Sequence, residues 1–138
     1  MSRHTLLLVG ASFVASLALF TSLQAQPAAP FTIEQANAGR TAYETTCAGC
    51  HGGNLAGPPA LAGAQFRTGW GSRTTRDLLT AIQSMPPEQP GGLPEATYLN
   101  IAAYILQTNG GIPGTQPLTT TTAQIGRASC RERVFLTV

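Results

Sequence analysis

Lysine is absent from this sequence, and charged residues make up only 10% of its 138 residues. Between residues 26 and 123, four arginines stand against five carboxylates, which leaves a net charge of −1. Binding of nucleic acid needs a basic surface that neutralises phosphates, and long-range steering toward an acidic partner needs a strong positive field. The near-neutral composition argues against both, so we expect any partner to dock through short-range contacts.

Cys47 and Cys50 are separated by two residues, and His51 follows the second cysteine at once. This Cys-x-x-Cys-His spacing is typical of the attachment of a c-type haem. Both thiols would form thioether bonds to the porphyrin vinyl groups, and His51 would become the proximal iron ligand because the tether holds it beneath the ring. The motif therefore predicts one covalently bound haem.

Other interpretations of the two cysteines fit the sequence less well. A structural zinc site needs four ligands, and apart from Cys130 only His4 and scattered carboxylates are left to complete one. A thioredoxin-like redox pair is expected in a βαβ context, whereas this motif lies in a helical setting rich in glycine and proline. A plain structural disulfide is disfavoured for a similar reason.

Residues 1–25 have the pattern of a secretory signal peptide. Arg3 and His4 precede an apolar stretch over residues 5–20, and a small-residue cleavage site follows. The apolar stretch is shorter than the roughly 20 residues of a spanning helix, so we expect no stable membrane insertion after cleavage, with an uncleaved anchor as the alternative. Export favours a periplasmic location.

Residues 124–138 break abruptly from the threonine-rich stretch before them and resemble a translated sequencing adapter. We interpret them as an artefact and leave them, with Cys130, out of the functional argument. Residues 115–123 are expected to be a threonine-rich linker or tail, and residues 26–114 to form one small domain. A domain of this size buries a modest fraction of its surface, and a haem would supply the missing apolar core.

Helix signals begin early in this domain. Thr32 and Gln35 form a capping box, and Phe31 is placed to pack on the first turn. These residues predict a helix over residues 33–46 that the Cys-His motif closes. A loop rich in glycine and proline is expected over residues 52–63.

Two further helices are expected downstream. Thr74 with Asp77 resembles a second helix start, and apolar residues follow at helical spacing until Pro86. A third helix is expected to begin near Pro94, at a favourable first-turn position, and to end at Asn109 before a glycine. No strand pattern or internal repeat is evident, so the sequence predicts an all-α fold.

The order of these features resembles a small class I cytochrome c. A helix, the Cys-His motif, a Pro-Leu loop, Met85-Pro86 and a closing helix with Tyr104 follow one another within residues 31–114. Residues 85–93 and 103–110 look particularly like cytochrome c domains associated with bacterial quinoprotein dehydrogenases. The resemblance implies three main helices around one covalently bound haem c and its iron.

The same resemblance implies a set of residues that contact the haem. Met85 would be the sixth iron ligand, with a gap-filling core methionine as the alternative. Pro59 matches the proline whose carbonyl bonds the ligating histidine, and Pro58 competes for this role. Leu61 would pack on the haem face, and Trp70 would bond a haem propionate unless it is simply a core residue.

Other residues are expected to have structural roles. Gly39 and Tyr43 match a family pattern in which a missing side chain lets the first and last helices cross closely, with Tyr104 as the partner. Arg67 and Arg73 are expected to be solvated.

A class I cytochrome c is an electron carrier and not an enzyme, so the resemblance implies outer-sphere electron transfer with both axial ligands retained. Its redox partners would include a quinoprotein dehydrogenase or a terminal oxidase. Two alternatives stay open at this point. One is the N-terminal haem module of a truncated quinohaemoprotein dehydrogenase, and the other is a haem enzyme or gas sensor with a labile Met85 ligand.

Overall fold

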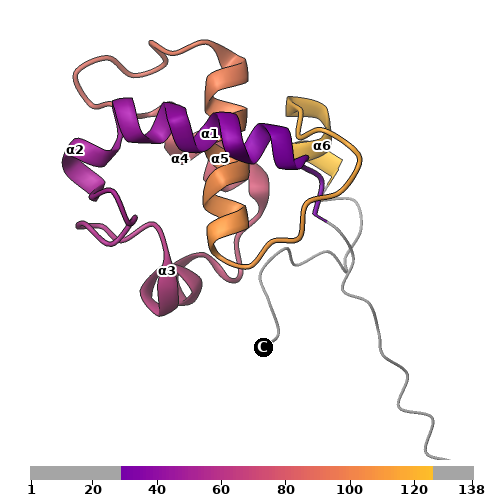
Figure 1. Cartoon of the computed structure of the whole chain (residues 1–138), viewed down its shortest axis with the longest axis horizontal. Helices are drawn as coiled ribbons and strands as arrows, with labels where there is room; N and C mark the ends of the chain where they lie inside the picture. The colour runs from indigo at the N-terminus through magenta and orange to yellow at the C-terminus, as the bar shows by residue number, and fades with distance from the viewer. Residues whose placement is uncertain (1–28, 126–138) are drawn as a thin grey trace, which may run out of the picture.

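The computed structural model describes residues 29–125, which form helices joined by loops (Figure 1). The helices in this part are α1 (Ile33–Thr46), α2 (Ala48–His51), α3 (Gly63–Trp70), α4 (Thr75–Gln83), α5 (Glu95–Thr108) and α6 (Thr120–Ile125). The described residues contain no strand, although one isolated bridge joins Ala29 and Pro113. The all-α fold class is confirmed. The expected leader and residues 126–138 lie outside the described residues.

Helix α1 begins at the expected capping box. The Thr32 hydroxyl accepts from the backbone N–H of Gln35, and the Gln35 side chain accepts from the backbone N–H of Thr32, both at 3.3 Å. Phe31, just before the cap, is fully buried. One stripe of the helix faces the core, with buried residues at spacings of three and four: Ala36, Gly39 and Tyr43.

Helices α1 and α5 cross each other near their middles (Figure 1). A Cβ atom on Gly39 would collide with the backbone carbonyl of Asn100, so the crossing requires glycine at this position. Beside it, the rings of Tyr43 and Tyr104 lie 5.5 Å apart at an angle of 57°. The close crossing expected from Gly39 and Tyr43 is therefore confirmed.

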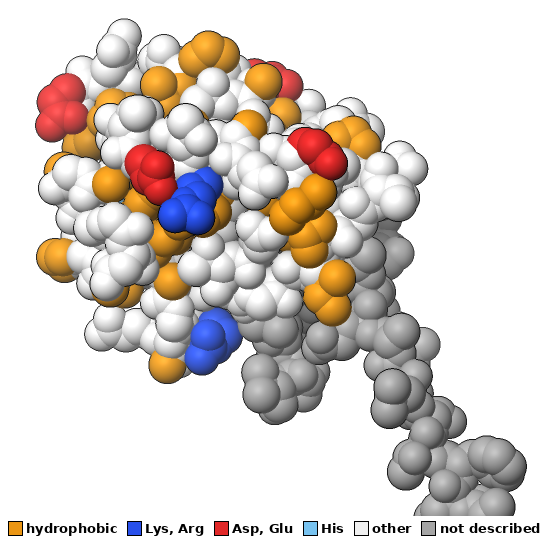
Figure 2. Space-filling model, in the orientation of Figure 1, with side chains coloured by type: hydrophobic (Ala, Val, Ile, Leu, Met, Phe, Trp, Pro, Cys, Tyr) orange, Lys and Arg blue, Asp and Glu red, His pale blue; other side chains and the backbone are white. Residues whose placement is uncertain are grey.

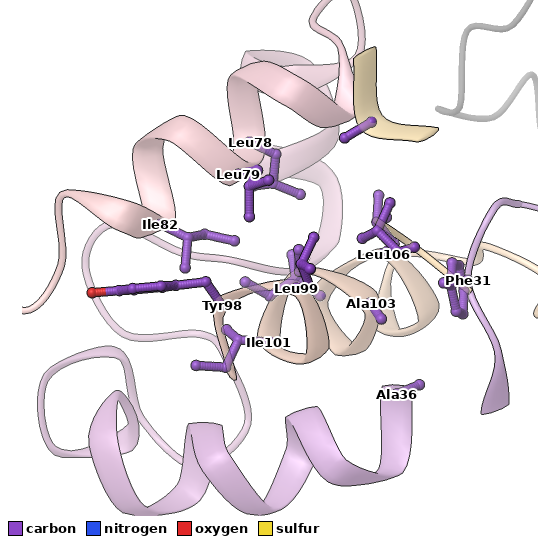
Figure 3. Packing of buried hydrophobic residues seen from close by; sticks show 14 of the residues in the cluster. Phe31, Ala36, Leu78, Leu79, Ile82, Tyr98, Leu99, Ile101, Ala103 and Leu106 are labelled. Atoms are coloured by element: carbon purple, nitrogen blue, oxygen red, sulfur yellow. The ribbon is translucent and has the colours of Figure 1, made fainter. Parts of the chain in front are cut away.

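Helix α4 also begins at its expected cap and turns an apolar face toward α5. Thr74 Oγ1 accepts from the Asp77 N–H at 3.2 Å, and Asp77 Oδ2 accepts from the Thr74 N–H at 2.9 Å. Figure 3 shows the α5 side chains enclosed between α4 and α1. Helix α5 is apolar on most sides, which is expected of a helix packed from several directions. Its buried residues are Tyr98, Leu99, Ile101, Ala102, Ala103, Ile105 and Leu106.

The threonine-rich tail packs against the rest of the fold. Leu118 is 1% exposed and belongs to the core cluster. The Gln35 side chain bonds both backbone groups of Leu118, accepting from its N–H at 2.6 Å and donating to its carbonyl at 2.9 Å. Helix α6 then lies against α4. Among the described helices, none combines the length and the apolar character needed to cross a membrane.

Candidate functional site

The two cysteines lie where α1 passes into α2. The Cys47 N–H donates to Tyr43 O at 2.8 Å, and the His51 N–H donates to Cys47 O at 2.9 Å, so the motif continues the helical path. Cys47 is half-buried, Cys50 is exposed and both thiols are free. Residues three apart lie on one side of a helical turn, so both thiols can reach the same flat group. Burial raises the pKa of the Cys47 thiol above its ordinary value.

The loop that follows the motif folds back onto His51. Nδ1 of His51 lies 3.0 Å from the carbonyl oxygen of Pro59. A carbonyl oxygen can only accept, so Nδ1 carries the proton and the lone pair of the neutral ring is on Nε2. The resemblance implies this contact for Pro59, and it is Pro59 rather than Pro58 that lies at this distance. The bond orients the imidazole and increases its donor strength.

A glycine and a tyrosine hold the beginning of the loop against the motif. The Gly57 N–H donates to His51 O at 2.8 Å, and a Cβ on Gly57 would approach that oxygen to 2.7 Å, so only glycine allows the chain this close. The Tyr43 hydroxyl donates to Gly52 O at 2.7 Å. Burial raises the pKa of Tyr43 to about 12, so the hydroxyl remains a donor at neutral pH. These bonds connect α1 to the segment that carries His51.

The far end of the same loop is held by Asn109, which is 2% exposed. Its Nδ2 donates to Leu61 O at 2.9 Å, and its Oδ1 accepts from the Gly63 N–H at 3.1 Å. Leu61 is partly buried and packs against the core cluster. Asn109 thus joins the end of α5 to the loop that presents Pro59. The sequence marked Asn109 only as the end of a helix.

Met85 follows α4 and keeps its side chain at the surface, 40% exposed. Its N–H donates to Ile82 O at 2.9 Å, and its carbonyl accepts from the Tyr98 hydroxyl at 2.9 Å. The backbone of Met85 is therefore held at both polar groups while the thioether remains accessible. A methionine that fills a gap in the core would be buried instead.

Trp70 ends α3 between aromatic and cationic neighbours. Its ring stacks on Phe66 with the centroids 5.7 Å apart, and the Arg73 guanidinium carbon lies 4.8 Å from the indole centroid. The indole is partly buried and packs against the core cluster. Trp70 and Arg73 also line an open hollow beside α4. Arg73 is exposed, as expected, but it covers the indole as well as facing water.

The family comparison covers most of these elements. A sequence model of the family described as cytochrome c oxidase, cbb3-type, subunit III matches residues 34–105, about half of the chain. The chain belongs to this family. It contains a class I c-type cytochrome domain, so it carries electrons by means of haem. Comparison with curated proteins and with solved structures gives no match.

A cytochrome c domain holds haem c and its iron covalently, and the donor groups of the site fit that cofactor. Two free thiols lie one helical turn apart, as two thioether bonds to one ring require. His51 presents Nε2 because its other nitrogen is bonded to Pro59. The accessible sulfur of Met85 is a soft donor of the kind that haem iron accepts.

The sequence missed two supports of the cytochrome site. Tyr98 bonds the backbone of Met85, and Asn109 bonds the loop that carries Pro59. Both lie on α5, whose apolar residues indicate a helix but not the distant groups that its polar atoms meet. The short distance in sequence from Met85 to Tyr98 is the one signal that could have suggested the first contact.

Proposed function

We propose that the chain is a periplasmic mono-haem c-type cytochrome that passes single electrons between redox partners through a haem ligated by His51 and Met85. The observation that carries this proposal is the 3.0 Å contact between His51 Nδ1 and Pro59 O. It orients the imidazole and leaves the Nε2 lone pair for iron, next to two cysteines that would anchor the ring.

Met85 is the sixth ligand in this proposal. Its thioether is accessible, and its backbone is held by hydrogen bonds on both sides. Pro86 follows it and restricts the backbone of Met85 to extended conformations, which stiffens the segment that presents the sulfur. A thioether ligand raises the reduction potential relative to a second imidazole, which suits an electron carrier.

In this proposal the protein holds the two iron ligands in place and keeps substrates from reaching the iron. When bound, the haem supplies an iron that accepts and releases one electron at a time. With His51 and Met85 both holding the iron, the chain would offer no open coordination position to a substrate. The loops that carry them are tied to α1, α4 and α5, so we expect both residues to stay in place in both oxidation states of the carrier.

A terminal oxidase is the partner that we propose as acceptor, because the family description names a cbb3-type oxidase. Figure 2 shows that charged side chains on the face in view are few and that neither sign is gathered into a patch. One exposed ion pair, between Arg40 and Glu44 at 3.0 Å, further reduces the local field. Short-range apolar contact around an exposed haem edge would then dominate docking.

The proposed periplasmic location depends on residues 1–25, which have the signal-peptide pattern and lie outside the described residues. Attachment of c-type haem in bacteria takes place outside the cytoplasmic membrane, as the family resemblance implies. The signal-peptide pattern and the place of haem attachment are both consistent with a carrier in the periplasm.

The ligand set is tested by replacing Met85. The oxidised haem-loaded protein is expected to show the weak far-red absorption that arises from sulfur bound to ferric iron. Met85→Ala should abolish this band and open the iron to cyanide, because alanine has no donor atom. Ile112→Ala is the matched control, since Ile112 is another exposed apolar side chain at 46%. If Met85→Ala keeps the spectrum of the unaltered protein, the ligand assignment is wrong.

A further inference from the structure

One phenol group joins the two ends of the loop formed by residues 85–93. The Tyr98 hydroxyl donates to the carbonyl of Met85 at 2.9 Å and accepts from the N–H of Leu93 at 3.2 Å. The hydroxyl therefore uses both its donor and an acceptor position on backbone groups. Met85 begins this loop, and Leu93 ends it just before α5.

The position of that hydroxyl is set by the core. Tyr98 lies in the first turns of α5, is 2% exposed and belongs to the core cluster. Figure 3 shows its ring beside Ile82, with the hydroxyl directed away from the other labelled core residues. A buried ring with two rotatable bonds loses little freedom when it forms hydrogen bonds, so it is a rigid support.

The loop itself is otherwise attached mainly to α4. The Met85 N–H donates to Ile82 O at 2.9 Å, and the Gly91 N–H donates to Gln83 O at 2.8 Å. The Tyr98 hydroxyl is thus the link between the backbone of Met85 and α5. Without this hydroxyl, the Met85 carbonyl would need a water molecule as its hydrogen-bond donor. The backbone of Met85 would then be held only through its N–H, which bonds Ile82 O.

We propose that Tyr98 is a positioning residue for the Met85 thioether, and this inference rests on the proposed role of Met85 as an iron ligand. The core fixes the phenol, the phenol fixes the Met85 backbone, and the fixed backbone limits how far the sulfur can move. An iron–thioether bond competes with external ligands, so the freedom of the sulfur sets how often the sixth position opens. The Tyr98 hydroxyl keeps that position closed.

The test compares three haem-loaded proteins: the unaltered chain, Tyr98→Phe and Tyr104→Phe. Phenylalanine keeps the ring and its packing, so Tyr98→Phe removes only the two hydrogen bonds. Tyr104→Phe removes a hydroxyl six residues further along α5, and in the described structure no hydrogen bond joins Tyr104 to the loop. Cyanide binding to the ferric protein reports how often the sulfur leaves, and the far-red band reports whether it is bound.

We expect Tyr98→Phe to bind cyanide about tenfold faster than the unaltered protein, which corresponds to about 1.4 kcal/mol. Its far-red band should disappear at a lower guanidinium concentration than the unfolding of the helices requires. The amide proton of Leu93 in the ferrous protein should also exchange faster, because it loses its acceptor. Tyr104→Phe should match the unaltered protein in all three measurements.

The outcomes separate this inference from the assignment of Met85. If Met85→Ala abolishes the far-red band but Tyr98→Phe binds cyanide at the unaltered rate, the positioning role is overturned and the ligand stands. If Met85→Ala leaves the band in place, both are overturned. A fall in melting temperature for Tyr98→Phe without a change in cyanide rate would show a purely structural residue, and would also overturn the inference.

Discussion

At the scale of single residues, polar atoms inside the core decide how firmly the haem loops are held. The Asn109 side chain makes three hydrogen bonds, to Leu61, Gly63 and Ile105. A buried amide of this kind contributes chiefly because its removal leaves buried donors and acceptors unpaired away from water. The loop that presents Pro59 to His51 is therefore held at one end by a residue far from it in sequence.

We expect Asn109→Ala to lower the free energy of unfolding of the haem-loaded protein by about 2 to 3 kcal/mol, because the Leu61 carbonyl and the Gly63 N–H lose their partner. Denaturant unfolding followed by circular dichroism would measure it. The control is Asn37→Ala, at an exposed position of α1, where a change within about 0.5 kcal/mol is expected. Equal effects at both positions would show that the buried amide does not hold the loop.

At the scale of elements, capping explains which helices the sequence revealed. Both α1 and α4 begin at a capping box, and the sequence predicted both starts correctly. Helices α2 and α3 have no side-chain hydrogen bond at their N-caps, Cys47 and Ala62. They are also short, so no long hydrophobic period marks them. Neither they nor α6 were predicted, because contacts with the rest of the fold stabilise such short helices.

The helix crossing gives a prediction at this scale. Gly39→Ala should destabilise the protein by about 2 to 3 kcal/mol or more, because the new Cβ would collide with the Asn100 carbonyl and force α1 and α5 apart. Thermal unfolding of the haem-loaded protein is the measurement.

The matched control for that crossing is Gly69→Ala in α3. A Cβ there would meet no atom within 4 Å, and alanine favours a helix by up to about 1 kcal/mol relative to glycine. Gly69→Ala should therefore be neutral or slightly stabilising. Similar losses for the two glycine substitutions would mean that the close crossing is not what makes Gly39 necessary.

At the scale of the whole molecule, the low charge is the feature that bears most directly on how a partner would approach. Figure 2 shows sparse charges of both signs, and the chain has no lysine. Residues 26–123 carry four arginines and five carboxylates. A field this weak gives little steering at distances beyond the immediate contact.

We therefore expect the rate of electron transfer to the proposed partner, a terminal oxidase, to change only a few-fold as the Debye length falls from about 30 Å at 0.01 M salt to about 8 Å at 0.15 M. Stopped-flow oxidation across a salt series would measure this rate, with an uncharged small oxidant as control for salt effects on the haem itself. A fall of about tenfold or more would contradict the prediction. It would show that Arg67, Arg73 and Arg76 act together as a local docking charge.

The sequence by itself determined the features that depend on neighbours within a few positions. The haem attachment motif and both capping boxes are of this kind, because their function follows from covalent spacing and local hydrogen bonds. The fold class followed from them, and the family match confirms it.

Only the tertiary structure decided which distant groups meet. Gln35 bonds Leu118 across 83 positions, and Asn109 bonds Leu61 across 48. Even Tyr98 and Met85, 13 positions apart, meet only because α4 and α5 pack together. A sequence shows that a side chain is able to donate or accept a hydrogen bond. The packing of the helices around Gly39 and the core sets the distances at which those bonds form.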